Sequence, residues 1–326
     1  MTIRILLPEL DGCRLRSMSG ARAAARVQSM EQSMRNRLTF GPIMLAGVLA
    51  VLWLDHAIEV WTRGWAASPR GVGGAGLLLL MLLIVPPAVL ELATIFAVER
   101  VRPYRFIAFA GCSSLSAHAF LTQFAWFRPY AASSLAFIIV SVMLFAALRR
   151  AWVRQTEEAI LRMAGTVLAT LYLGGLGWFL MALRVKQSAS GRFSGSTMLI
   201  VMVLLAVKFT DIGAYFGGKL LGRHKLIPWL SPRKTWEGLI CGMLLGGIVG
   251  AVCASWILQL DWLKASIFGI LLGGVGQLGD LLESLMKRDA QVKDSGAMIP
   301  GFGGVLDVID SPLLAAPFAY LLFSSL

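Results

Sequence analysis

The sequence predicts an all-α integral membrane protein with about nine transmembrane helices and a cytoplasmic N-terminus. Of its 326 residues, 57% are hydrophobic and 15% are charged, whereas soluble globular domains carry about 25% charged residues. The mean hydropathy is +0.73. Apolar runs close to the roughly 20 residues that a helix needs to cross a bilayer recur along the chain, and the loops between them are alternately rich and poor in basic residues.

The predicted helices follow the apolar runs in chain order. The first run contains Asp55 and His56, and the eighth ends at Asp280. The second contains Pro86 and Pro87, which predict a kink because proline lacks a backbone donor and its ring clashes with the preceding turn. The runs are residues 40–58, 73–98, 106–127, 131–148, 164–183, 195–216, 238–260, 265–282 and 304–325.

The distribution of Lys and Arg predicts which helix ends face the cytoplasm, because cytoplasmic loops retain basic residues. With the N-terminus inside, the segments assigned to the cytoplasm hold 22 of the 30 Lys and Arg residues, and the loops assigned to the other side hold 7. A missed or additional helix would destroy this alternation. The count therefore supports the segmentation, and it predicts a multi-pass protein of the inner (cytoplasmic) membrane.

The net charge of +12 is explained by this basic cytoplasmic face, which attracts anionic lipid headgroups. No nucleic-acid partner is expected. Residues 1–38 hold seven arginines and are predicted to form a basic cytoplasmic arm, with a targeting peptide or an early start codon as the alternatives. No cleaved signal peptide is predicted.

The membrane-spanning part divides into two regions of different character. Residues 39–195 are predicted to be a scaffold of helices with a lipid groove, and Glu91 is either a satisfied polar group or a functional one. Residues 196–326, with cytoplasmic loops 217–237 and 283–302, carry most of the remaining polar motifs.

The first polar motif surrounds the predicted loop 217–237. Lys208 and Asp211 share a helix face because they are three residues apart, and either their mutual pairing or a bound metal or phosphate would offset their burial. Ser231 followed by Pro232 predicts a helix start. Such a start, with nearby hydroxyl and basic groups, suits polyphosphate binding. The candidate phosphate-binding residues are Lys219, Ser231, Arg233, Lys234 and Thr235.

The second polar motif extends from the eighth apolar run into the ninth. Asp280, Glu283, Ser284 and Lys287 are spaced to lie on one helix face, and Arg288 follows them. A glycine-rich stretch then predicts a loop whose backbone can approach a ligand closely. This stretch includes Lys293, Asp294, Gly296, Pro300, Gly301, Gly303 and Gly304.

Four carboxylates of the second region form a candidate metal set. They are Asp211, Asp280, Asp307 and Asp310, the last two lying three residues apart at the start of the ninth apolar run. Carboxylate oxygens combined with substrate phosphates are the usual environment of Mg²⁺. Because many basic residues accompany them, the motifs favour metal-assisted phosphoryl or nucleotidyl transfer.

These motifs resemble those of the phosphatidate cytidylyltransferase (CDP-diglyceride synthetase) family. The resemblance covers roughly residues 205–320 and includes the segments "KFTDIGAYFGGKLLGRHKL", "SPRKTWEG" and "SLMKRDAQVKDSGAMIPGFGGVLDVID". Two positions depart from the family pattern: Phe302 replaces a histidine and Val308 replaces an arginine. Because every carboxylate is retained, we expect an active but divergent member.

The resemblance implies an enzyme that converts CTP and phosphatidate into CDP-diacylglycerol and pyrophosphate in phospholipid biosynthesis. It implies a need for Mg²⁺, leaves room for a second cation such as K⁺, and is compatible with a homodimer. It assigns the metal to Asp280, Asp307 and Asp310, with Asp211 nearby. The other implied catalytic residues are Lys287, Arg288, Lys293 and Asp294, and the implied nucleotide-binding residues are Lys219, Ser231, Lys234, Thr235, Gly303 and Gly304.

Two other functions are compatible with the sequence. One is the same chemistry on another lipid phosphate, or kinase activity towards a polyprenol, which would be decided by a lipid groove that the sequence does not define. The other is a transporter or a non-catalytic paralogue. A transporter would more typically show inverted repeats with broken helices in both halves, whereas the polar motifs here are confined largely to one half.

Overall fold

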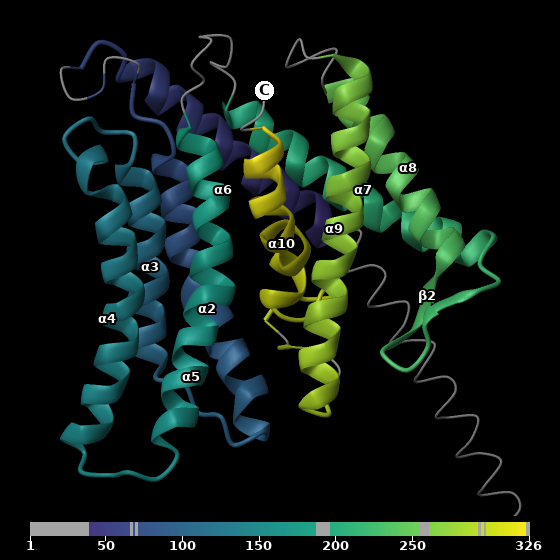
Figure 1. The fold of residues 1–326 in the computed structure, drawn as a ribbon. Coiled ribbons are helices and arrows are strands. Elements are labelled where there is room, and N and C mark those ends of the chain that lie inside the picture. Colours follow the sequence, from purple (N-terminus) through teal and green to yellow (C-terminus); the bar gives the residue numbers. More distant parts are fainter. Residues whose placement is uncertain are drawn as a thin grey trace, which may run out of the picture.

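The computed structural model describes residues 39–65, 68, 71–186, 196–253, 261–292, 295–296 and 298–323, which form a bundle of helices (Figure 1). The first helix is Thr39–Trp61. It is followed by α2 (Ala75–Val98), α3 (Arg105–Leu121), the 3-10 helix η1 (Arg128–Tyr130), α4 (Ala131–Trp152), α5 (Ala159–Ala169), the π-helical turn η2 (Thr170–Gly175), α6 (Leu176–Val185), α7 (Ser196–Leu220), β1 (Lys225–Ile227), β2 (Ser231–Thr235), α8 (Trp236–Cys253), α9 (Trp262–Asp289) and α10 (Leu306–Leu322).

The structure confirms the all-α membrane class. Each predicted apolar run falls on a helix in the described part of the chain, and α2 continues through Pro86 and Pro87. Seven helices there are long and apolar enough to cross a membrane. Helices α3 and α10 have 17 residues each, fewer than the roughly 20 that a helix needs to cross a bilayer. The total of nine transmembrane helices therefore stays a prediction.

Successive helices alternate in direction (Figure 1). The connections after α2, after α4, after α7 and after α9 all lie at the same end of the bundle, which we call the hairpin end because it carries the β1–β2 hairpin. These are the connections that the charge count assigns to the cytoplasm. The alternation therefore agrees with the predicted segmentation.

Small residues allow α7, α8 and α9 to approach closely. Gly242, Gly246 and Gly250 recur every fourth residue on one face of α8. A Cβ atom at Gly242 would lie 2.6 Å from the carbonyl oxygen of Thr210 in α7, and one at Gly250 would collide with the carbonyl oxygen of Ala265 in α9. Such contacts are typical of helix packing in membranes, and they bring the polar motifs of these three helices together.

The segment between α7 and α8 differs from its prediction. The expectation that Ser231 and Pro232 start a helix is wrong, because residues 231–235 form β2, in which Ser231 pairs with Ile227 of the antiparallel strand β1. Helix α8 starts after Thr235, whose hydroxyl accepts a hydrogen bond from the backbone N–H of Gly238 at 3.1 Å. Ser231 and Thr235 are both residue types that favour the N-cap position of a helix. Because Ser231 is paired in a strand, Thr235 is the residue that caps α8.

A buried ion pair joins the N-terminal helices at the end opposite the hairpin. The guanidinium of Arg184 on α6, 1% exposed, contacts Asp55 at 2.5 Å and Glu59 at 2.7 Å on the first helix. Asp55 also accepts hydrogen bonds from the backbone N–H groups of Gly74 and Gly76 at the start of α2. This network explains how the charge in the first apolar run is accommodated.

Replacing Arg184 by alanine should lower the free energy of unfolding by about 3–5 kcal/mol, because Asp55 would keep its charge without its buried partner. Unfolding in mixed detergent micelles measures the change. The control is Arg162→Ala, which removes a partly exposed pair with Glu158 and should cost no more than about 1 kcal/mol. Equal losses in the two variants would contradict this account.

Candidate active site

Three carboxylates meet between α9 and α10. Asp280 and Glu283 lie one turn apart on α9, and Asp310 lies on α10; each offers an oxygen, and these oxygens are within 4.8 Å of one another. A Cβ atom at Gly279 would lie 2.8 Å from the carbonyl oxygen of Asp310, so this glycine allows the two helices to approach. We call Asp280, Glu283 and Asp310 the carboxylate cluster.

The carboxylate cluster fits a hard divalent cation. Glu283 and Asp310 are buried, and three close carboxylates repel one another unless a cation compensates for their charge. One oxygen of Glu283 is buried without a hydrogen-bond partner in the described part of the chain. Oxygen donors of this kind match the preference of Mg²⁺.

Asp307 lies outside this cluster and holds the loop before α10. Its oxygens accept hydrogen bonds from the Lys287 ammonium at 2.6 Å, from the Ser295 hydroxyl at 2.9 Å and from the backbone N–H of Gly304 at 2.7 Å. The sequence-based metal set included Asp307 and omitted Glu283. The geometry favours Glu283 as the third carboxylate, and its spacing from Asp280 was the available signal.

Lys287 links the carboxylate cluster to Asp307. Its buried ammonium lies 3.3 Å from Glu283, one turn earlier on α9, and 2.6 Å from Asp307 on α10. This cation offsets part of the negative charge between the two helices.

Glu91 on α2 fixes the start of α10. Glu91 is 7% exposed, and its carboxylate accepts hydrogen bonds from the backbone N–H groups of Val305 at 2.9 Å and Leu306 at 2.8 Å. The N–H groups of a first helical turn have no partner within the helix, and a carboxylate there also interacts favourably with the helix dipole. Of the two interpretations of Glu91, the structure supports the satisfied polar group, whose hydrogen bonds go to the start of α10.

Two glycines shape the loop that precedes α10. A Cβ atom at Gly304 would collide with the Ser295 hydroxyl and with the Glu91 carboxylate. Gly303 has a φ of +100°, a backbone conformation that residues with a Cβ atom rarely adopt. The structure therefore gives Gly303 and Gly304 a role in loop conformation.

Asp211 on α7 lies beside the carboxylate cluster without forming part of it. One oxygen accepts a hydrogen bond from the Gln277 side chain at 2.7 Å, and the other lies 3.6 Å from the Lys208 ammonium. Lys208 also donates to the backbone carbonyl of Val308 at 3.0 Å. Gln277, one turn before Asp280, was missed by sequence reasoning, although its helical spacing from Asp280 could have indicated it.

The hairpin brings one cation to the carboxylate cluster. The Lys234 ammonium lies 2.8 Å from Asp280 and donates to the carbonyl of Gln277 at 3.3 Å. Arg288 contacts the carbonyl of Leu230 in the hairpin turn at 3.4 Å. These contacts join the hairpin to the end of α9.

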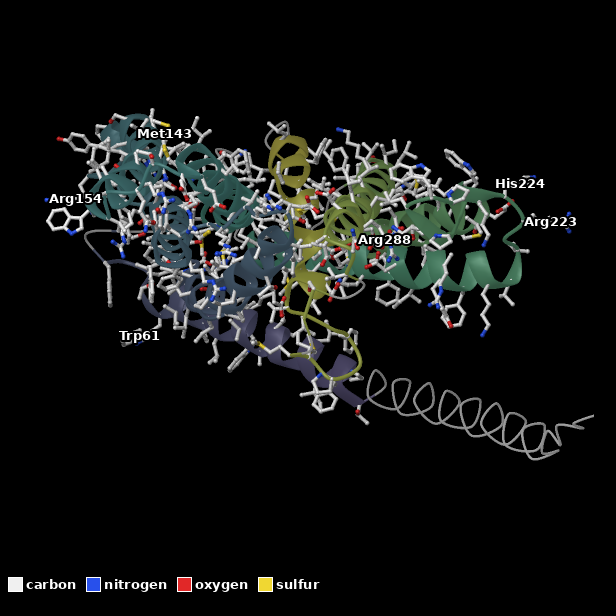
Figure 2. All side chains as sticks on the ribbon, turned by 90° about the horizontal axis from the view of Figure 1, so that it is seen from below. Trp61, Met143, Arg154, Arg223, His224 and Arg288 are labelled. Carbon is white, nitrogen blue, oxygen red and sulfur yellow. The ribbon has the colours of Figure 1, made fainter. Side chains whose placement is uncertain are left out.

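The remaining predicted residues are placed differently. Figure 2 shows Arg288 near the centre of the hairpin end, and Arg223 and His224 at its outer edge. Lys219 is exposed and lies over the Tyr215 ring. Thr235 is buried beneath α8, and Ser231 is half-buried. Lys293 and Asp294 lie outside the described residues.

Fold and site together define a multi-pass membrane protein with a carboxylate-rich, cation-lined site near one end of its helix bundle. The chain belongs to the cytidylyltransferase family, whose sequence model matches residues 35–326.

Individual relatives match over shorter stretches. The chain is 44% identical over 133 residues to the phosphatidate cytidylyltransferase of Synechocystis, covering 39% of this chain and 44% of the relative. It is 46% identical over 121 residues to the enzyme of that name in Bacillus subtilis, covering 35% and 43%. It is 36% identical over 153 residues to the uncharacterised protein YnbB of Escherichia coli, covering 47% and 49%. The matches thus span about half or less of these relatives.

Replacing Glu91 by glutamine should loosen the start of α10, because both carboxylate oxygens accept backbone N–H groups and an amide nitrogen cannot. Hydrogen exchange at the Val305 and Leu306 amides should accelerate by about tenfold or more. Mass spectrometry of the exchanged peptide measures this effect. Glu99→Gln, at the exposed end of the same helix, is the control; equal exchange in the two variants would rule out the contact.

Proposed function

We propose that this protein is a phosphatidate cytidylyltransferase, which converts CTP and phosphatidate into CDP-diacylglycerol and pyrophosphate. Two curated relatives carry that name at 44% and 46% identity. The observation that carries the proposal is the cluster of Asp280, Glu283 and Asp310 between two cations, Lys234 and Lys287. Such a site suits two polyanionic substrates, one of them anchored in the membrane.

The proposed location is the cytoplasmic membrane, with the hairpin end facing the cytoplasm. The excess of Lys and Arg in the segments assigned to that side supports this orientation. CTP would then reach the site from the cytosol, and phosphatidate would reach it from the adjoining leaflet.

In the proposed reaction, an oxygen of the phosphatidate phosphate attacks the α-phosphorus of CTP while the bond to pyrophosphate breaks. The carboxylate cluster would hold Mg²⁺, with Asp211 and Asp307 close to it. Mg²⁺, when bound, neutralises negative charge on the phosphate oxygens. The mechanism needs no covalent intermediate with the protein.

The protein's own cations orient the substrates in this proposal. Lys234 is placed at the cluster edge, where it would contact a CTP phosphate. Arg288, at the centre of the hairpin end, would bind the pyrophosphate or the lipid phosphate. The further proposed contacts are Lys219, Ser231, Thr235, Lys287, Lys293, Asp294, Gly303 and Gly304.

Purified protein in detergent should convert radiolabelled CTP into a lipid-soluble product only when phosphatidate and Mg²⁺ are both present. Asp280→Asn should reduce this activity by at least about 100-fold, because it removes a negative charge from the cluster. Asp289→Asn, at the exposed end of α9, is the matched control and should retain activity.

Thermal unfolding and gel filtration would verify that both variants are folded. If the activity of Asp280→Asn stayed within threefold of the parent, the assignment of Mg²⁺ to the carboxylate cluster would be contradicted. No product from the folded parent protein would refute the proposed reaction and direct attention to another lipid phosphate.

Phe302→His should leave activity equal or higher if this position lies within reach of a substrate phosphate. The Phe302 ring borders the first helix, since a Cβ atom at Gly41 would lie 3.3 Å from its Cζ atom. The same radiolabel assay measures the result, with Phe302→Leu as an apolar control. A large loss specific to histidine would instead show that the surroundings require an apolar side chain.

A further inference from the structure

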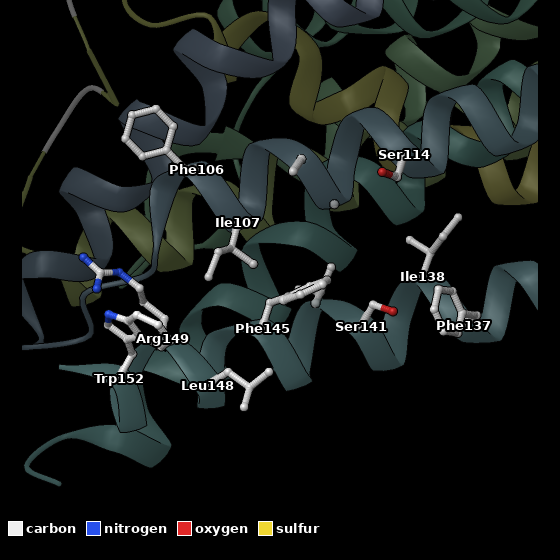
Figure 3. A pocket seen from close by; sticks show the side chains of 13 residues that line it. Phe106, Ile107, Ser114, Phe137, Ile138, Ser141, Phe145, Leu148, Arg149 and Trp152 are labelled. Atoms are coloured by element: carbon white, nitrogen blue, oxygen red, sulfur yellow. The ribbon is translucent and has the colours of Figure 1, made fainter. Parts of the chain in front are cut away.

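A groove of about 730 Å³ lies between α3 and α4, away from the candidate active site (Figure 3). Aromatic and aliphatic side chains form most of its walls, among them Phe106 and Ile107 from α3 and Phe137 and Phe145 from α4. Helix α4 stands at the edge of the bundle opposite the hairpin (Figure 1). The groove therefore borders the hydrocarbon region of the membrane.

One end of this groove is cationic. Arg149 and Trp152 lie together there, whereas Ser114 and Ile138 lie towards the other end (Figure 3). Arg149 is the one charged residue among the described residues that line the groove. Trp152 is 86% exposed, and tryptophan favours the membrane–water interface. The pair therefore marks the level of the lipid headgroups.

Arg149 differs from the neighbouring Arg150 in its contacts. Arg150 is buried and donates to the side chain of Gln155 and to the carbonyl of Glu157, so it shapes the connection to α5. Arg149 is exposed, and no ion pair joins it to a carboxylate of the described chain. Its charge is available to a ligand in the groove.

We propose that this groove binds an acyl chain of an anionic phospholipid, whose phosphate is held by Arg149. The apolar walls match the chain, and the single guanidinium matches a headgroup with net negative charge. A volume of this size is typical of sites for small ligands. A zwitterionic lipid carries its own cation beside the phosphate, so it should bind less well.

The site is separate from the one proposed for the reaction. The hairpin end, seen in Figure 2, has Arg288 near its centre and Arg154, in the connection that follows α4, at its edge. An anionic lipid bound near this edge would contact α3 and α4 and would not need to enter the carboxylate cluster. Its binding can therefore be measured independently of turnover.

The test is photo-crosslinking of the full-length protein in nanodiscs. The probes are phosphatidylglycerol and phosphatidylcholine that carry the same diazirine-labelled acyl chain, and mass spectrometry maps the labelled peptides. Phosphatidylglycerol should label residues 105–121 and 131–152 more strongly than phosphatidylcholine does. Arg149→Ala should reduce this labelling by about fivefold, and Arg149→Lys should restore most of it.

Two further variants separate the headgroup contact from the chain contact. Arg154→Gln removes an exposed charge outside the groove lining and should leave labelling unchanged. Ser141→Trp narrows the groove and should reduce labelling by both probes. Equal labelling by the two lipids, or no effect of Arg149→Ala, would overturn the proposal. Absence of labelling in a protein that light scattering shows to be dimeric would instead assign this face to a second copy of the chain.

Discussion

The contact between Glu91 and the first turn of α10 determines the geometry on which the candidate site depends. It joins positions 214 residues apart in the chain, Glu91 on α2 and Val305 before α10. Because it satisfies two N–H groups that the helix itself cannot pair, it sets where α10 starts and therefore where Asp307 and Asp310 lie. The N-terminal helices thus contribute directly to the site.

Around this contact, negative and positive groups are distributed so that charge within the bundle is largely compensated. Lys287 lies between Glu283 and Asp307, Lys234 contacts Asp280, and Lys208 lies near Asp211. The compensation is incomplete at the carboxylate cluster, where one oxygen of Glu283 has no partner among the described residues. Since burying an uncompensated charge is costly, the imbalance favours binding of a cation at this point.

Long apolar runs predicted the helices well, because a helix that crosses a bilayer requires such a run and the run is visible locally in the sequence. The helical spacing of Asp280, Glu283 and Lys287 likewise predicted that they share a face. What could not be predicted was the partner of each group across helices: no spacing in the sequence shows that Glu91 meets the start of α10 or that Gln277 meets Asp211. The hairpin was missed because the Ser231–Pro232 capping signal is local, whereas strand pairing with residues 225–227 decided the structure.

The two departures from the family pattern occupy different surroundings. At position 308 the backbone carbonyl, which every amino acid has, accepts the hydrogen bond from Lys208, so replacement of arginine by Val308 leaves that contact intact. At position 302 the side chain itself meets the first helix near Gly41, and an aromatic ring there adds apolar contact between the glycine-rich loop and the N-terminal region. The loop is thus held on one side by the polar contacts of Ser295 and Gly304 with Asp307 and on another by an apolar one. Because both depend on the same short segment, a change at Phe302 should be transmitted to Asp307 through the backbone between them.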